Sequence, residues 1–256
     1  MSSLKKWMQS KQSAIILPTI TTLILFILWE IIVRLFSIPN FILPAPSAVI
    51  VALFSSGQIL IKHALQTLMT TVVGFVLALA LGLLLGFWIG FSKIAYAILY
   101  PLLVGFNTIP KVALVPLMAL WFGVGAVPAI LTAFLLAFFP IAVNVAVGLD
   151  TVEPEMRDVL KSLGASPWEI FVKVGLPHSM PYLFASLKIA ISSAFIGSVI
   201  SETVASNGGL GFVILTASSQ FEVALAFSGL LVLSAMGVIL YSFFATLERY
   251  IIHWAR

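Results

Sequence analysis

Polar and charged residues inside apolar segments are the first candidates for chemistry in this sequence. Lys111 follows Pro110, with Asn107 and Thr108 just before them, and Glu202 stands near the end of a later apolar segment. A charge surrounded by apolar residues is costly to bury, and such charges commonly line the route of a solute or ion. Alternatively, Lys111 and Glu202 pair with each other and have a structural role. The residue types leave both interpretations open.

Patterns for catalysis and for metal binding are absent from the sequence. The histidines stand apart at His63, His178 and His253, and none belongs to a His-Glu-x-x-His motif. The chain has no cysteine, which excludes thiolate metal sites and cysteine nucleophiles. It also has no Gly-Lys dipeptide, and therefore no Gly-x-x-x-x-Gly-Lys-[Ser/Thr] phosphate-binding loop. We expect that the chain is not an enzyme and binds no metal or cofactor itself.

The composition indicates which solvent surrounds these residues. Hydrophobic residues make up 61% of the 256 residues and charged residues 9%, against roughly 45–50% and roughly 25% in soluble domains. With a mean hydropathy of +1.18, the chain has too little polar surface for a water-soluble globule. We therefore predict an all-α membrane protein that crosses a lipid bilayer several times.

Six apolar runs have about the 20 residues that a helix needs to cross a bilayer. The third run is too long for one straight helix and contains Pro101, Pro110 and Pro116. Because proline removes a backbone donor and clashes with the preceding turn, we predict a break near Pro110. Backbone groups freed there must be buried or face a water-filled cavity. The predicted spans are 14–36, 68–91, 94–122, 127–148, 180–201 and 223–247.

Six spans place both termini on the same side of the membrane, and positive charges indicate which side. A cytoplasmic N-terminus puts ten of the 13 Lys and Arg residues inside, in agreement with the positive-inside rule. Arg34 and Lys62 then lie outside, and Lys111 lies within a span. Nucleic acid is not the expected partner, because no basic run exceeds Lys5-Lys6. The inside residues are Lys5, Lys6, Lys11, Lys93, Arg157, Lys161, Lys173, Lys188, Arg249 and Arg256.

The second span carries a small residue at every fourth position, a pattern that lets another helix approach closely. That helix belongs either to the same subunit, which we favour, or to a second subunit. The stripe consists of Gly74, Ala78, Gly82, Gly86 and Gly90.

Two further features are predicted near the outer side. Glu30 and Arg34 lie one helical turn apart and can form an ion pair. Residues 207–211 are too rich in glycine to remain helical. We interpret them as a loop that dips toward a pathway or touches an outside partner, or else as a plain connector. The residues of this loop are Asn207, Gly208, Gly209 and Gly211.

The segment of about residues 150–178 concentrates the charged side chains of the chain and joins the fourth and fifth spans on the cytoplasmic side. Apolar residues at helical spacing predict a first short helix, which Gly164 ends as a C-cap. Ser166-Pro167-Trp168-Glu169 has the pattern of a capping box that starts a second helix, and Gly175 and Pro177 stop it. An amphipathic hairpin on the membrane surface and a docking site for a partner both fit. The apolar face comprises Val152, Met156, Val159, Leu160 and Leu163.

This segment resembles the EAA loop of ATP-binding-cassette importer permeases. That pattern reads Glu-Ala-Ala, three residues, Gly, nine residues, then Ile, any residue, Leu-Pro. Gly164, Leu176 and Pro177 match at the right spacing, Asp158 replaces the Glu and Val174 the Ile. Val159 and Leu160 depart from the two alanines. The resemblance assigns ATPase coupling to Arg157, Asp158, Val159, Leu160, Leu163, Gly164, Val174, Leu176 and Pro177.

The resemblance extends over nearly the whole chain and is to the permeases for nitrate, sulfonate, taurine and related small solutes. Further matching segments are 44–47, 109–117, 120–125 and 202–211. The resemblance implies one transmembrane domain over residues 1–256 with the type I importer permease fold, in the cell inner membrane. It implies a homodimer with the pathway at its interface, two separate ATPase subunits that bind ATP and Mg²⁺, and an extracytoplasmic solute-binding protein. The sequence leaves a rival, an ion-driven secondary transporter, for which a broken span is also typical.

Overall fold

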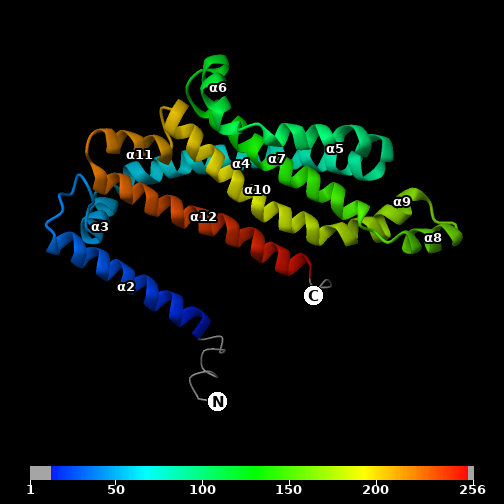
Figure 1. The fold of residues 1–256 in the computed structure, drawn as a ribbon, viewed down its shortest axis with the longest axis horizontal. Coiled ribbons are helices and arrows are strands. Elements are labelled where there is room, and N and C mark those ends of the chain that lie inside the picture. Colours follow the sequence, from blue (N-terminus) through cyan, green and yellow to red (C-terminus); the bar gives the residue numbers. More distant parts are fainter. Residues whose placement is uncertain (1–12, 253–256) are drawn as a thin grey trace, which may run out of the picture.

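The computed structural model describes residues 13–252, without the side chains of residues 13–15, Pro154 and Arg157. Predicted cytoplasmic residues Lys5, Lys6, Lys11 and Arg256, and also His253, therefore lie outside the described residues. Within that range every regular element is a helix (Figure 1). In chain order they are α2 Ser13–Leu35, α3 Pro46–Ser55, α4 Gly57–Phe91, α5 Lys93–Thr108, η1 Lys111–Leu114, α6 Val115–Phe122, α7 Ala126–Asp150, α8 Pro154–Ser162, α9 Pro167–Ile170, η2 Phe171–Gly175, α10 Leu176–Ala205, α11 Leu210–Ser219 and α12 Val223–Ile251.

The predicted spans correspond to helices that are long and apolar enough to cross a membrane. Five helical segments meet this criterion singly, and α5 with η1–α6 adds a sixth if the bent pair is one span. The main difference is at the start of α4, which begins at Gly57 rather than near residue 68. Polar residues between 57 and 68 lower the hydropathy there, but none of them is a proline, so the helix is not interrupted.

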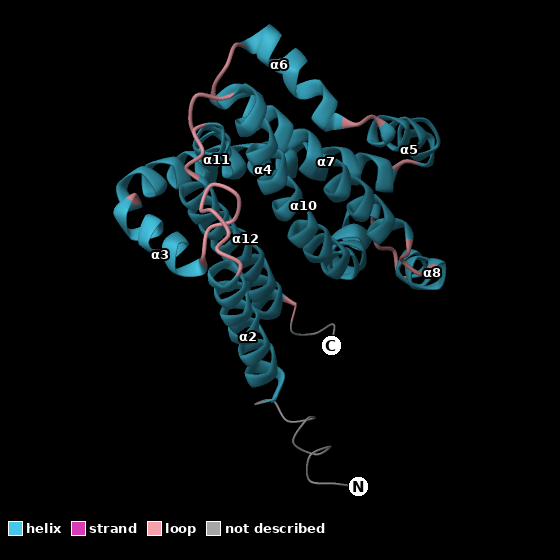
Figure 2. Cartoon of the chain, turned by 60° about the vertical axis from the view of Figure 1, so that its left-hand side comes forward, coloured by secondary structure: helices cyan, strands magenta, loops and turns pink. Residues whose placement is uncertain are grey.

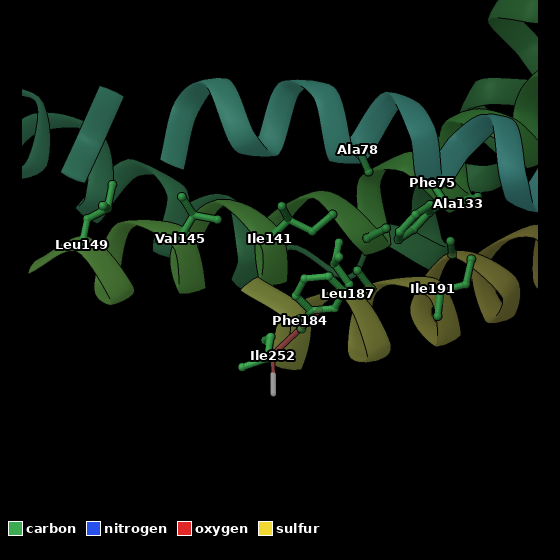
Figure 3. Packing of buried hydrophobic residues seen from close by; sticks show 13 residues of the cluster. Phe75, Ala78, Ala133, Ile141, Val145, Leu149, Phe184, Leu187, Ile191 and Ile252 are labelled. Atoms are coloured by element: carbon green, nitrogen blue, oxygen red, sulfur yellow. The ribbon is translucent and has the colours of Figure 1, made fainter. Parts of the chain in front are cut away.

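The core lies between α4, α7 and α10, which pack side by side. Phe75 and Ala78 of α4 contact a row of α7 residues, and Phe184, Leu187 and Ile191 of α10 close the cluster from the other side (Figure 3). Helix α2 is mostly exposed and stands away from this core in Figure 1. The α7 row consists of Ala133, Ala137, Ile141, Val145 and Leu149.

The small-residue stripe of α4 packs against α7 of the same chain. A Cβ added to Gly74 would lie 2.6 Å from the Cβ of Ala133, and one on Gly86 would lie 2.8 Å from that of Val145. Packing within one subunit is therefore confirmed, and the alternative, that the stripe forms a subunit interface, is wrong. The face of α4 that carries the stripe is already covered by α7.

The third span is broken where proline predicted it. Helix α5 ends at Thr108, Ile109 and Pro110 are extended, and the chain resumes as η1 and α6 after a bend of 75°. Figure 2 shows α6 turned away from α5 at the top of the molecule. Pro110 cannot donate to the preceding turn, which accounts for the break at this residue.

Candidate functional site

The segment of residues 150–178, here called the α8–α9 hairpin, protrudes from one end of the bundle (Figure 1). Helix α8 ends at Ser162, and Gly164, two residues later, has the left-handed conformation with a φ of +82°. The Gly164 amide donates to the Lys161 carbonyl (2.9 Å) and the Ala165 amide to the Leu160 carbonyl (3.0 Å). These two bonds form a Schellman motif, so the predicted C-cap is confirmed.

The second helix of the hairpin begins as predicted but does not end as predicted. The Ser166 Oγ accepts from the Glu169 amide (3.3 Å) while the Glu169 carboxylate accepts from the Ser166 amide (2.8 Å), which completes the capping box. Gly175 and Pro177 do not stop the helix. A π-helical turn over Phe171–Gly175 connects α9 to α10, and Pro177 lies in the first turn of α10, where proline is tolerated. The hairpin therefore continues directly into a span.

The apolar face of α8 is largely exposed. Val159 has 60% of its surface exposed and Leu163 has 77%, whereas Val152 is buried at the base and Leu160 is half-buried. Asp158 pairs with Lys161 at 3.5 Å, with both side chains exposed. Val174, Leu176 and Pro177 are half-buried at the junction with α10, and the side chain of Arg157 lies outside the described part of the chain. The protrusion thus presents apolar side chains that nothing in the described chain covers.

Lys111 lies at the break of the third span, next to a cavity. Its ammonium group donates to the side-chain oxygen of Asn107 at 2.7 Å and to the carbonyl of Asn107 at 3.1 Å. The cavity, of about 430 Å³, lies between the break and α7, and its walls are almost entirely apolar. Besides Lys111 and Asn107 it is lined by Leu103, Phe106, Ile109, Leu114, Phe134, Leu135, Phe138 and Phe139.

Glu202 is buried elsewhere and does not pair with Lys111. Its carboxylate accepts hydrogen bonds from Thr67 Oγ1 (2.8 Å), Thr70 Oγ1 (3.2 Å) and the Gly211 amide (3.2 Å). The suggested Lys111–Glu202 pair is therefore wrong, because the two charges are satisfied by different, neutral partners. The other residues suggested for a pathway, Asn107, Thr108 and Pro110, are exposed at the break of the third span, whereas Glu202 is buried.

The glycine-rich loop turns back over Glu202 instead of extending outward. The Gly209 amide donates to His63 Nδ1 (3.0 Å), and Gly208, Gly209 and Gly211 are buried, while Asn207 is exposed. The predicted loop is confirmed for residues 207–209, whereas Leu210 and Gly211 already belong to the short helix α11. Hydropathy did not reveal α11 because ten residues are too few for a span.

One ion pair lies within a span, and another connects two spans. The predicted pair of Glu30 and Arg34 is confirmed at 2.6 Å, and the Ser47 amide also donates to Glu30 (3.0 Å), which links α2 to the start of α3. Lys188 of α10 pairs with Glu248 of α12 at 2.7 Å. Sequence reasoning missed this second pair, because its members are 60 positions apart and no local spacing connects them.

In the described part of the chain, no cluster of three or more His, Asp or Glu residues could hold a metal ion.

Comparison with known proteins places this architecture in a family. The family described as binding-protein-dependent transport system inner membrane component matches residues 78–253. The chain belongs to this family. The predicted membership in the importer permease family is thereby confirmed, and the predicted type I fold is confirmed by the solved structures described below.

Relatives of this permease have names that refer to transport of different small solutes. A probable ABC transporter permease of Haemophilus influenzae is 34% identical over 88% of this chain and 91% of its own length. The riboflavin transport system permease RibX of Chloroflexus aurantiacus is 36% identical over 92% of this chain and 88% of its own. The taurine transport permease TauC of Escherichia coli is 26% identical over 97% and 92%.

The fold of the permease also matches solved structures. A chain of the MetNI methionine ABC transporter, in an inward-facing conformation, superposes with a TM-score of 0.67 at 21% sequence identity. The match covers 77% of this permease and 97% of the MetNI chain. At this identity the likeness concerns the fold alone.

Proposed function

We propose that this permease forms the translocation pathway of an ATP-driven importer for a small solute and is one of two identical subunits in the cell inner membrane. The two termini face the cytoplasm, and a solute-binding protein delivers the solute from outside. ATP and Mg²⁺ bind to two separate ATPase subunits, since the chain has no phosphate-binding loop. Residues 1–256 act as a single transmembrane domain whose contact with the ATPase is the α8–α9 hairpin.

The observation that carries this proposal is the exposed apolar face of the hairpin. Val159 and Leu163 lie on a protrusion where water would otherwise contact them, as is typical of a surface that a partner covers. The hairpin is joined to α7 at one end and to α10 through the π-helical turn at the other. A displacement of α8 by an ATPase is therefore passed to two spans of the core.

The cavity beside the broken span supports a role in the solute pathway. Lys111 has no carboxylate within ion-pair distance among the described residues, so its charge is available to a solute. A cation at the edge of an apolar cavity suits a small organic anion with an apolar body. Relatives are named for aliphatic sulfonates and taurine, and others for riboflavin and formylaminopyrimidine. We propose that the solute is a small compound that is nitrate-like, sulfonate-like or a related small organic compound.

Replacement of Leu163 with Asp tests the docking role. The charge would be desolvated in an apolar contact, so we expect Leu163→Asp to reduce both co-purification with the co-expressed ATPase and ATP-dependent uptake. Ser162→Asp is the control, since it adds the same charge one position earlier, on a neighbouring polar face of the same last turn. A hairpin that only lies on the membrane predicts that both variants bind the ATPase and transport normally.

Uptake by the parent without any ATPase would instead support an ion-driven transporter, which the broken span also suits.

A further inference from the structure

Helix α10 extends from the α8–α9 hairpin to the buried Glu202. It runs without interruption from Leu176 to Ala205, about 45 Å at 1.5 Å per residue. Figure 1 shows its first turn beside α9 and its last turn beside α11. One continuous helix therefore connects the hairpin to the end of the bundle where Glu202 lies.

Glu202 connects this far end of α10 to two other elements. Its carboxylate accepts from Thr67 and Thr70 of α4 and from the Gly211 amide in the first turn of α11. Thr67 Oγ1 also accepts from the Leu210 amide at 2.8 Å. The first amides of α11, which have no partner within their own helix, are thus satisfied by Glu202 and by its hydrogen-bond partner.

The glycine loop fits so closely over Glu202 that a side chain added there would displace its neighbours. A Cβ on Gly209 would overlap the carboxyl group of Glu202, and one on Gly208 would overlap the side chain of Gln66. A Cβ on Gly211 would lie 2.5 Å from the carbonyl oxygen of Val199. Gly209 also has a φ of +91°, which glycine adopts without strain.

We propose that Glu202 is a positioning residue that fixes the glycine loop and α11 to α4 and α10 as one rigid unit. This unit stays closed, with the contacts of Glu202 to α4 and α11 intact, throughout the transport cycle. This inference rests on the proposed function, in which the ATPase moves the hairpin and α10 passes that movement to the outer side. The unit stays closed because its opening would leave a buried carboxylate and several hydroxyl and amide groups without partners. Glu202 therefore determines whether the outer loop follows α10, and it does not line the pathway.

A cross-link tests whether the unit stays closed. The rings of His63 and Phe212 are neighbours, with centroids 6.1 Å apart, and the chain has no native cysteine. The double variant His63→Cys/Phe212→Cys is assembled with its ATPase and bridged by a short bifunctional thiol reagent. We expect the bridged complex to take up solute at the rate of the same complex before bridging, with each single-cysteine variant treated alike as a control. Loss of uptake only in the bridged double variant would mean that the loop detaches during transport, and would overturn the inference.

The positioning role itself is tested by the ratio of solute transported to ATP hydrolysed. Glu202→Gln places an amide donor among hydroxyl and amide donors. Gly209→Ala pushes the loop off the carboxylate. We expect each variant to lower the ratio of solute transported to ATP hydrolysed several-fold, while the ATPase stays bound. Gly57→Ala is the control, since its Cβ would meet nothing within 4 Å. A purely structural role predicts less assembled complex with an unchanged ratio, and that result would overturn the inference. Should Glu202→Gln not assemble, Gly209→Ala and the cross-link decide. If the unmutated complex takes up solute independently of ATP, no such ratio can be measured, and the proposed function is refuted instead.

Discussion

Gly82 of α4 lies directly against Ile141 of α7. A Cβ at Gly82 would stand 2.9 Å from Ile141 Cγ2 and 3.4 Å from the Phe138 carbonyl oxygen. The same closeness recurs about two turns further along, where a Cβ on Gly90 would stand 2.7 Å from Leu149 Cδ1. In lipid, helices associate through this kind of close packing, because the apolar solvent supplies no hydrophobic driving force between them. The contact surface of α4 and α7 is therefore a main source of stability for the subunit.

Gly82→Leu should destabilise the subunit itself. A leucine side chain cannot fit between α4 and α7 without moving one helix, and overpacking of this kind typically costs about 1–3 kcal/mol. We expect a lower thermal unfolding temperature in detergent and a smaller yield of folded protein. Gly105→Leu is the matched control, because Gly105 is also helical but a Cβ there meets nothing within 4 Å. Equal melting temperatures for the two variants would contradict this account of the stripe.

Features set by local sequence were predicted well. Hydropathy located the spans, Pro110 located the break, and the caps at Gly164 and Ser166 followed from residue type and spacing. In each case the physical cause lies within a few residues of the feature. The i, i+4 spacing of Glu30 and Arg34 identified that pair for the same reason.

Features that depend on which helix faces meet were not predictable in the same way. Pairing of Glu202 with Lys111 is one of the two interpretations that the sequence leaves open, because both are charges in apolar segments. The actual partners of Glu202, Thr67 and Thr70, lie more than 130 positions away from it. Gly175 signalled a helix end, yet the chain accommodates it within a π-helical turn, where Leu149 and Phe171 pack around it. Helices α3 and α11 are too short for a hydropathy signal.

Gly164→Val should impair ATP-driven uptake without preventing membrane insertion. A Cβ at Gly164 meets nothing within 4 Å, so the effect comes from the positive φ alone, which a β-branched residue resists at a cost of about 1–3 kcal/mol. The turn of the hairpin then opens and α8 is misplaced for the ATPase. Gly164→Asn is the control, since asparagine tolerates this conformation. The measurement is uptake and ATPase co-purification at equal amounts of inserted protein; similar losses in both variants would show that backbone conformation is not the cause.

Lys111→Met should lower transport of an anionic solute while the complex stays assembled. The substitution keeps an unbranched side chain of similar length and removes the only charge among the described residues that line the cavity by the broken span. Lys62→Met removes the same charge from an exposed position on α4 and is the control. Uptake of a labelled anion, at matched levels of assembled complex, provides the comparison. Full transport by Lys111→Met would remove this residue from the pathway.

The ion pair between Lys188 and Glu248 should contribute to the packing of α10 against α12. Both side chains are mostly buried, with 20% and 28% of their surfaces exposed, and both lie in helices that are long and apolar enough to cross a membrane. Loss of one partner leaves the other charge without compensation in an apolar environment, whereas loss of both removes that penalty. We expect Lys188→Met and Glu248→Gln each to lower the unfolding temperature in detergent, and the double variant to recover most of the loss. The exposed pair of Asp158 and Lys161, 3.5 Å apart, is the control, because solvent-exposed pairs contribute little. Additive losses in the double variant would show that the two side chains stabilise the helices independently of each other.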